Sequence, residues 1–134
     1  MTKYMLDTNT VSSLLRQNLN VGKRITSIPM DCLCLSAISE GELLYGLAKK
    51  PGAKNLHKAV QEFLKRIDVL SWNSQVAEHY GKLRAELEVK GNILGPLDMQ
   101  IAAHAFQVGA TLVTNDRAFN MVKKLKIEDW TLGS

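Results

Sequence analysis

Short apolar stretches alternate along the chain with longer segments whose apolar residues recur at helical spacing. The stretch CLCLS at residues 32–36 alternates apolar and small polar side chains and is typical of a buried strand. By the same pattern we expect strands at residues 3–6, 32–36, 69–70, 110–114 and within 125–130. The apolar positions between these stretches repeat every three or four residues, which predicts amphipathic helices.

The ends of the predicted helices carry recognisable start and stop signals. Ser39 and Glu42 match the S-x-x-E capping box, and Pro51 with Gly52 would end that helix. Asn73 is a good cap for a later helix. The predicted helices therefore begin at Thr10, Ser39, Asn55, Asn73 and Gly95-Pro96, and the last two end at Gly91 and Gly109.

Strands that alternate with helices are typical of an α/β domain with a mostly parallel sheet covered by helices. A length of 134 residues fits one domain with a substantial core, so we expect residues 1–134 to form a single domain. In such folds, functional sites form beyond the carboxyl ends of the strands.

Four acidic residues occupy that edge of the predicted sheet. Asp7 and Asp116 follow strands, whereas Glu42 and Asp98 lie in the first turns of helices. Each has an ordinary explanation as a cap, a turn former or a favourable charge at a helix N-terminus. Together they would repel, because two carboxylates about 4 Å apart repel by about 4 kcal/mol at an effective dielectric of 20. A divalent cation removes that cost, and oxygen ligands favour Mg²⁺ or Mn²⁺.

The chain is moderately basic, with 17 Lys and Arg against 13 Asp and Glu and a net charge of +4. This balance is consistent with a polyanionic partner, although solvated helix ends explain lysine clusters equally well. An acidic metal site on a basic protein suggests phosphodiester chemistry. The candidate contacts to nucleic acid are Lys49, Lys50, Lys54 and Arg117.

Other classes of protein are disfavoured by the sequence. The first apolar run is interrupted at Asp7, unlike a signal peptide, and no apolar window is long enough for a membrane span, so a cytoplasmic protein is expected. Cys32 and Cys34 alternate within one apolar run and are interpreted as core residues. The three histidines show no H-E-x-x-H pattern and are interpreted as surface or core residues.

The order of these motifs resembles that of PIN-domain ribonucleases, specifically the VapC-type toxins of bacterial toxin–antitoxin systems. The resemblance covers nearly the whole chain and rests on a series of short segments. These are YMLDTNT (4–10), ISEGELLYG (38–46), LRAEL (83–87), GPLDMQIAAHA (95–105), LVTND (112–116) and EDW (128–130).

The resemblance implies a three-layer α/β/α sandwich and places the family's acidic quartet on Asp7, Glu42, Asp98 and Asp116. All four would be catalytic and would bind metal, Glu42 either directly or through water. The neighbouring polar residues expected to orient these ligands are Asn9, Thr114 and Asn115. Glu40 is an additional acid that we place outside the metal shell, because on a helix it points about 200° away from Glu42.

The function implied is a Mg²⁺-dependent endoribonuclease, with Mn²⁺ as an alternative ion and water as the nucleophile. Among RNAs we favour transfer RNA, with the anticodon loop of initiator transfer RNA as one candidate. The implied partners are a VapB-type antitoxin and a second copy of the toxin, and operator DNA would be bound only through the antitoxin. Leu43, Leu44, Tyr45 and Leu47 have helical spacing that fits either a core or such an interface.

Two other functions are compatible with parts of the pattern. A non-catalytic nucleic-acid or protein interaction module on the same fold would not require all four acids. A phosphoaspartyl phosphatase of the haloacid dehalogenase type would use Asp7 as its nucleophile, but that class has a second acid where this chain has Asn9. Divalent-metal binding that is lost in Asp7→Ala would distinguish the nuclease from the interaction module.

Overall fold

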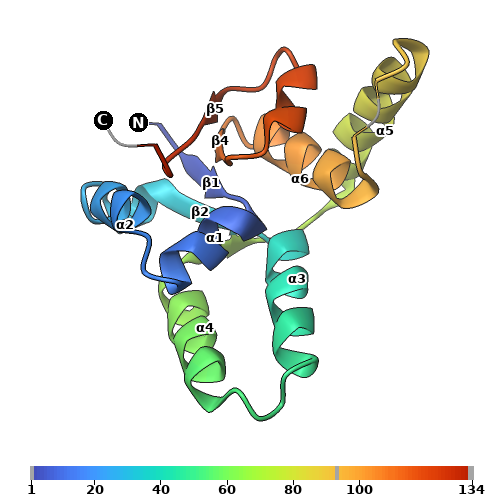
Figure 1. The fold of residues 1–134 in the computed structure, drawn as a ribbon. Helices are drawn as coiled ribbons and strands as arrows, with labels where there is room; N and C mark the ends of the chain where they lie inside the picture. The colour runs from blue at the N-terminus through green and yellow to red at the C-terminus, as the bar shows by residue number, and fades with distance from the viewer. Residues whose placement is uncertain (1, 93, 133–134) are drawn as a thin grey trace.

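The computed structural model describes residues 2–92 and 94–132, and it contains one five-stranded sheet in which every pairing is parallel (Figure 1). The strand order is β3-β2-β1-β4-β5, so the first strand lies at the centre. The strands are β1 (Tyr4–Leu6), β2 (Leu33–Ser36), β3 (Asp68–Leu70), β4 (Thr111–Val113) and β5 (Ile127–Glu128). All five predicted strands are therefore confirmed.

Helices connect these strands in the alternation that the sequence predicts. The α-helices are α1 (Thr8–Leu15), α2 (Leu19–Thr26), α3 (Ala37–Ala48), α4 (Lys54–Arg66), α5 (Ser74–Val89) and α6 (Pro96–Gln107). Two short 3-10 helices are η1 (Met30–Cys32) and η2 (Arg117–Met121). None of these described helices is long and apolar enough to cross a membrane.

Two apolar clusters cover the two faces of the sheet, as expected for a three-layer sandwich. One cluster joins Met5, Cys34 and Leu112 of the sheet to α5, α6 and η2. The other joins Leu6, Leu35 and Val113 to α1, α2, α3 and α4. Because neighbouring residues of one strand point to opposite faces, β1, β2, β3 and β4 each contribute to both clusters, whereas β5 contributes Ile127 to the first. The predicted α/β/α architecture is confirmed.

The predicted capping box of α3 is wrong. The helix begins three residues earlier, and its cap is Ser36, whose hydroxyl accepts a hydrogen bond of 3.1 Å from the backbone N–H of Ile38. Ser39 lies inside the helix, fully buried, and its hydroxyl has no hydrogen-bond partner among the described residues. Since the last strand residue also caps the helix, no loop separates β2 from α3.

Helix α2 is absent from the sequence prediction. Only Val21 of its eight residues is buried, and Gly22, a poor helix former, lies in its interior. The helix begins at the cap Asn18, whose side chain accepts a bond of 3.1 Å from the backbone of Val21. Other boundaries are close to those predicted: Asn73 caps α5, and Gly91 follows that helix with φ +71°. This left-handed conformation favours glycine because it has no side chain.

Several single-residue predictions are also decided by burial. Cys32 and Cys34 are free and buried, which confirms them as core residues. Within α3, Leu43 and Leu47 are buried in the core. Leu44 and Tyr45 are exposed, by 46% and 63%, and are the pair that remains free for an interface.

Candidate active site

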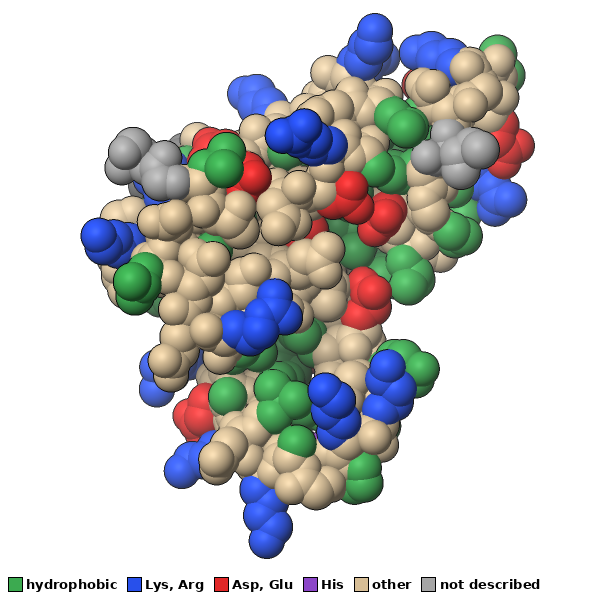
Figure 2. All heavy atoms as spheres, in the orientation of Figure 1, with side chains coloured by type: hydrophobic (Ala, Val, Ile, Leu, Met, Phe, Trp, Pro, Cys, Tyr) green, Lys and Arg blue, Asp and Glu red, His purple; other side chains and the backbone are tan. Residues whose placement is uncertain are grey.

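Four carboxylates occupy the carboxyl edge of the sheet, and we call them the carboxylate rim: Asp7, Glu42, Asp98 and Asp116. Asp7 directly follows β1, and Asp116 comes three residues after the end of the neighbouring strand β4. Asp98 lies in the first turn of α6, and Glu42 lies in α3, which starts at the end of β2. The parallel sheet thus brings together residues that are up to 109 positions apart. Figure 2 shows acidic side chains gathered in the middle of one face of the molecule.

Asp7 is the most deeply placed member of the rim, with only 4% of its surface exposed. Its Oδ1 accepts a hydrogen bond of 2.8 Å from the backbone N–H of Thr10 and so caps α1. Its own backbone N–H donates to the carbonyl of Val113, which ties it to β4. Burial raises the pKa of the Asp7 carboxyl, while the side chains of Thr114 and Thr10 act in the opposite direction and Asp116 adds a smaller repulsion.

Asp116 is held by hydrogen bonds that fix both its backbone and its side chain. Its backbone N–H donates to the hydroxyl of Thr114 at 3.0 Å, and its Oδ1 accepts from the backbone of Ala118 at 2.9 Å. The second bond caps η2. Thr114 is buried and contacts both Asp7 and Asp116, so the structure places it where an orienting residue would lie.

Asp98 shows that the rim is electrostatically coupled. Burial raises its pKa most, and the carboxylates of Asp116, Glu42 and Asp7 each raise it further. All three other members of the rim therefore lie close enough to repel Asp98. Glu40 does not contribute to this shift, in keeping with its expected place outside the rim.

Glu42 makes one hydrogen bond that the sequence does not reveal. The hydroxyl of Thr8 donates to its Oε1 at 2.7 Å, which links the first residue of α1 to α3. Thr8 lies next to Asp7 in the DTN segment, where Asn9 was the expected orienting residue. Asn9 and Asn115 are instead exposed and take part in no side-chain hydrogen bond among the described residues.

The donor set of the rim suits a hard divalent cation, because it consists only of carboxylate and hydroxyl oxygens whose charges repel one another. In the described part of the chain, however, no three acidic, histidine or cysteine side chains are arranged to hold one ion. Oδ1 of Asp7 already accepts a hydrogen bond from the backbone of Thr10, and Oε1 of Glu42 accepts one from the hydroxyl of Thr8. Binding one ion would therefore require side-chain rotation, or water molecules between the ion and some of the carboxylates.

The three histidines take part in contacts away from the rim. His57 bonds to the carbonyl of Lys50, and the ring of His79 lies 5.4 Å from that of Phe106. His104 is fully buried, and its Nδ1 is 2.7 Å from the hydroxyl of Ser36. Burial lowers the pKa of His104, so it is held neutral. The interpretation of the histidines as surface or core residues agrees with these positions.

The candidate RNA-binding lysines lie at the other end of α3 from the rim. Lys49 follows the last residue of α3, with its Nζ 4.7 Å from the ring centroid of Tyr45. Lys50 lies in the turn between α3 and α4, Lys54 is the first residue of α4, and Arg117 is exposed beside Asp116. Only Arg117 among these cations adjoins the rim in sequence.

Comparison with known proteins identifies the family. The PIN-domain family matches residues 4–125. The tRNA(fMet)-specific endonuclease VapC of Shigella flexneri is 38% identical, covering 98% of this chain and 100% of that protein. Its counterpart from Salmonella typhimurium is 37% identical over 97% and 99% of the two chains.

A solved structure agrees with these sequence matches. DNA-bound VapBC from Salmonella typhimurium contains a chain that is 37% identical and superposes with a TM-score of 0.90, covering 97% of this chain and 99% of that one. Both the sequence and the fold are thus similar from end to end. The chain belongs to the PIN-domain family and, within it, to the VapC group.

Proposed function

We propose that this protein is the toxin of a type II toxin–antitoxin module and acts as a metal-dependent endoribonuclease. The observation that carries the proposal is the carboxylate rim, in which Asp7, Glu42 and Asp116 each raise the pKa of Asp98. PIN-domain nucleases generally depend on divalent metal ions. The chain that carries this carboxylate rim is similar over nearly its full length to proteins that are named as endonucleases. We further propose that residues 1–134 form a single PIN domain.

The four rim carboxylates are assigned as the catalytic, metal-binding residues. Asp7, Asp98 and Asp116 would bind Mg²⁺, or Mn²⁺ in its place, and Glu42 would bind it directly or through water. A bound ion of this kind lowers the pKa of a coordinated water and stabilises charge on a phosphate. Thr8 holds Glu42, and Thr114 holds Asp116 and acts on Asp7, so these two threonines would keep the rim carboxylates oriented. Asn9 and Asn115 remain candidates for contacts to RNA or water.

The structural features of Asp7 disfavour the phosphoaspartyl alternative. A nucleophilic carboxylate must reach phosphorus, but Asp7 is 4% exposed and its Oδ1 caps α1. The non-catalytic alternative would not explain why the fold retains four mutually repelling carboxylates at one edge. Such repulsion costs stability and is relieved by a cation.

Transfer RNA is the proposed substrate, and initiator transfer RNA is its first candidate. Relatives from Salmonella typhimurium and Shigella flexneri are named as tRNA(fMet)-specific endonucleases. Single-stranded loops expose bases that a protein can splay and hold, so an anticodon loop is a suitable target. Lys49, Lys50, Lys54 and Arg117 are proposed to contact phosphates. We propose that the protein acts in the cytoplasm, where transfer RNA is found.

The proposed partners are a VapB-type antitoxin and a second copy of this chain. A relative of known structure is described as a DNA-bound VapBC assembly, and we propose that operator DNA reaches this chain only through the antitoxin. Leu44 and Tyr45 are exposed on α3 close to Glu42 and would lie at one of these interfaces. Burial of such side chains removes apolar surface from water.

The proposed function is tested by cleavage of purified transfer RNA. Cleavage should require added Mg²⁺ or Mn²⁺, stop with EDTA, and yield 5′-phosphate and 3′-hydroxyl ends. Products with 2′,3′-cyclic phosphates would show attack by the ribose hydroxyl and would overturn the water mechanism. The 5′ ends of RNA sequenced after brief expression would identify the cleaved RNA.

A further inference from the structure

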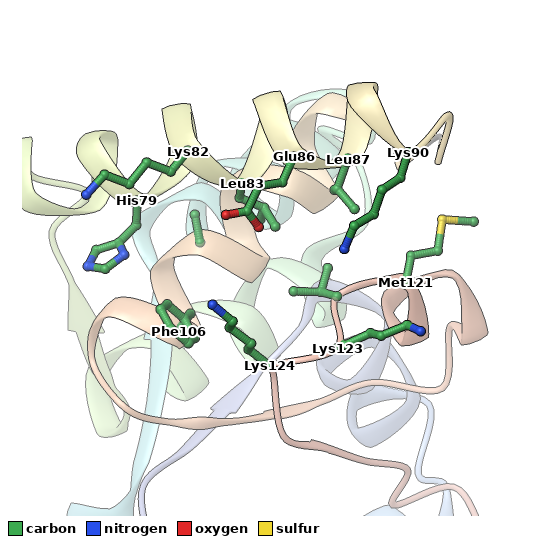
Figure 3. Close-up of a pocket in the computed structure, with 12 residues that line it drawn as sticks. His79, Lys82, Leu83, Glu86, Leu87, Lys90, Phe106, Met121, Lys123 and Lys124 are labelled. Carbon is green, nitrogen blue, oxygen red and sulfur yellow. The ribbon is translucent and has the colours of Figure 1, made fainter.

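A cavity of about 270 Å³ lies between α5, α6 and the segment that follows η2 (Figure 3). Its floor is apolar and includes Leu83, Leu87 and Val122. Four lysines line its mouth, and Glu86 is the one acidic residue in its lining. We call this cavity the lysine pocket after its four basic residues, Lys82, Lys90, Lys123 and Lys124.

The lysines come from two walls that are far apart in the sequence. Lys82 and Lys90 lie on α5 and at its end, separated by about 12 Å at a rise of 1.5 Å per residue. Lys123 and Lys124 come from the opposite wall. Figure 3 shows the amino groups of Lys90 and Lys124 directed into the cavity from these two sides. The pocket is thus a short groove with positive charge along both edges.

Most of this positive charge is not neutralised within the protein. Lys82 pairs with Glu78 at 3.5 Å on the exposed surface, where such a pair contributes little. None of the four ion pairs among the described residues includes Lys90, Lys123 or Lys124. Like charges gathered over an apolar floor repel one another, and an anionic ligand would relieve that repulsion.

An aromatic pair completes the groove at one end. Phe106 is 41% exposed, and its ring packs edge-on against that of His79 at 5.4 Å. Both residues line the pocket. Positive edges beside an exposed aromatic ring are the features with which proteins bind single-stranded nucleic acid, where lysines follow the phosphates and bases stack on the ring.

Two segments connect the lysine pocket to the carboxylate rim. Helix α6 carries Asp98 in its first turn and Phe106 eight residues later, a distance of about 12 Å along the helix. The segment η2 is capped by Asp116 at one end and reaches Met121, which lines the pocket, at the other. If an RNA strand is bound at the carboxylate rim, the nucleotides a few positions from the cleaved bond can therefore reach the lysine pocket.

We propose that the lysine pocket binds an unpaired stretch of the substrate RNA that flanks the cleaved bond. Phosphates would contact Lys90 and Lys124, and one base would stack on Phe106. This inference rests on the proposed ribonuclease function and adds a second site to it. An acidic amphipathic peptide would match the charge as well, but lysines on both edges of the groove and the exposed ring of Phe106 favour a nucleic acid strand.

The test compares two double variants that remove the same charge. Lys90→Gln/Lys124→Gln alters the pocket, whereas Lys58→Gln/Lys65→Gln alters α4, which packs on the opposite face of the sheet. Both are placed in the Asp7→Asn background, so that RNA binding is measured without cleavage. Circular dichroism checks that both variants are folded, and anisotropy follows a labelled transfer RNA from 50 to 200 mM salt.

The pocket variant should bind RNA about tenfold more weakly, with a salt slope reduced by about 1 for each lysine that contacts a phosphate. The α4 variant should match its parent. Phe106→Ala should weaken binding by about 5- to 150-fold, the range for the loss of one stacked base, without a change in salt slope. Equal affinity and slope in both lysine variants would overturn the proposal and leave the pocket to a protein ligand.

A second measurement separates this proposal from the proposed function. With Asp7 intact, the pocket variant should cut a dinucleotide, whose one phosphate lies at the rim, at the parent rate. It should cut transfer RNA with a raised KM. If the parent protein cuts no RNA with any divalent ion, the ribonuclease proposal fails. The binding comparison in the Asp7→Asn background still decides whether the lysine pocket holds RNA.

Discussion

The carboxylate rim and the lysine pocket lie towards opposite ends of α6 and carry opposite charge in different ways. The rim carboxylates are wholly or partly buried, and three of them accept hydrogen bonds from α1 or from neighbouring residues. The pocket lysines are exposed and, apart from Lys82, belong to none of the ion pairs in the described residues. Water and salt screen exposed charges much more strongly than buried or partly buried ones. Loss of a rim charge should therefore change catalysis and stability together, whereas loss of a lysine should change mainly RNA binding.

The largest effect is expected from neutralising the rim. Asp7→Asn, Asp98→Asn and Asp116→Asn should each reduce RNA cleavage by at least about 100-fold. Loss of a residue that only supports a metal ligand costs up to about 100-fold, and loss of a ligand itself should cost more. In metal-free protein, Asp98→Asn should also raise the melting temperature, because its carboxylate is repelled by three others. Cleavage kinetics and thermal unfolding measure the two effects. Normal cleavage by purified Asp7→Asn in Mg²⁺ would contradict the site assignment.

A smaller effect on cleavage should follow when the hydrogen bond from Thr8 to Glu42 is removed. Thr8→Val removes the hydroxyl that donates to Oε1 at 2.7 Å, and it should cost about tenfold in cleavage or in metal affinity. Thr8→Ser retains a hydroxyl and is the matched control. Titration with Mn²⁺ and cleavage assays should separate the two variants. If Val and Ser behave alike, the Thr8 bond has no role in the function of the rim.

The lysines at the end of α3 provide a third test, with an effect on binding alone. Replacing Lys49, Lys50 and Lys54 with Gln should weaken RNA binding a few-fold and flatten its salt dependence if these residues contact phosphates. The cleavage position should not move, because phosphate contacts carry little sequence information. An unchanged slope between 50 and 200 mM salt would show that these lysines are simply solvated.

The smallest expected effect is a change in stability with pH, and it depends on the buried hydrogen bond between His104 and Ser36. His104 bonds to Ser36, the cap of α3, and therefore connects α6, which carries Asp98, with α3, which carries Glu42. Burial lowers the pKa of His104 in the folded state below its usual value of 6.5. The unfolded chain thus binds the proton more readily, and stability should fall as the pH drops below about 6.5.

Urea unfolding across this pH range measures the contribution of His104. His104→Gln keeps a polar side chain but cannot be protonated, so its stability should depend less on pH than that of the parent protein. His57→Gln, at a partly exposed position of α4, is the control and should retain the parent dependence. Parallel curves for the parent and His104→Gln would show that His104 does not determine acid sensitivity.

The sequence by itself determined the order of the strands and of every α-helix except α2, and the edge at which the acids meet. These features depend on local signals, such as alternating apolar residues, the cap at Asn73 and the glycine at Gly91. Once a parallel sheet is inferred, geometry places strand ends and helix starts at one edge. Asp7, Glu42, Asp98 and Asp116 could therefore be selected before the structure was known.

Only the tertiary structure decided which side chains touch across elements. Ser36 rather than Ser39 caps α3 because β2 runs directly into the helix. Thr8 meets Glu42, 34 residues away, and His104 meets Ser36, 68 residues away. The lysine pocket likewise exists because α5 packs beside the segment after η2, which brings Lys90 opposite Lys124. Such contacts depend on how helices pack on the sheet, and local spacing along the chain does not specify that packing.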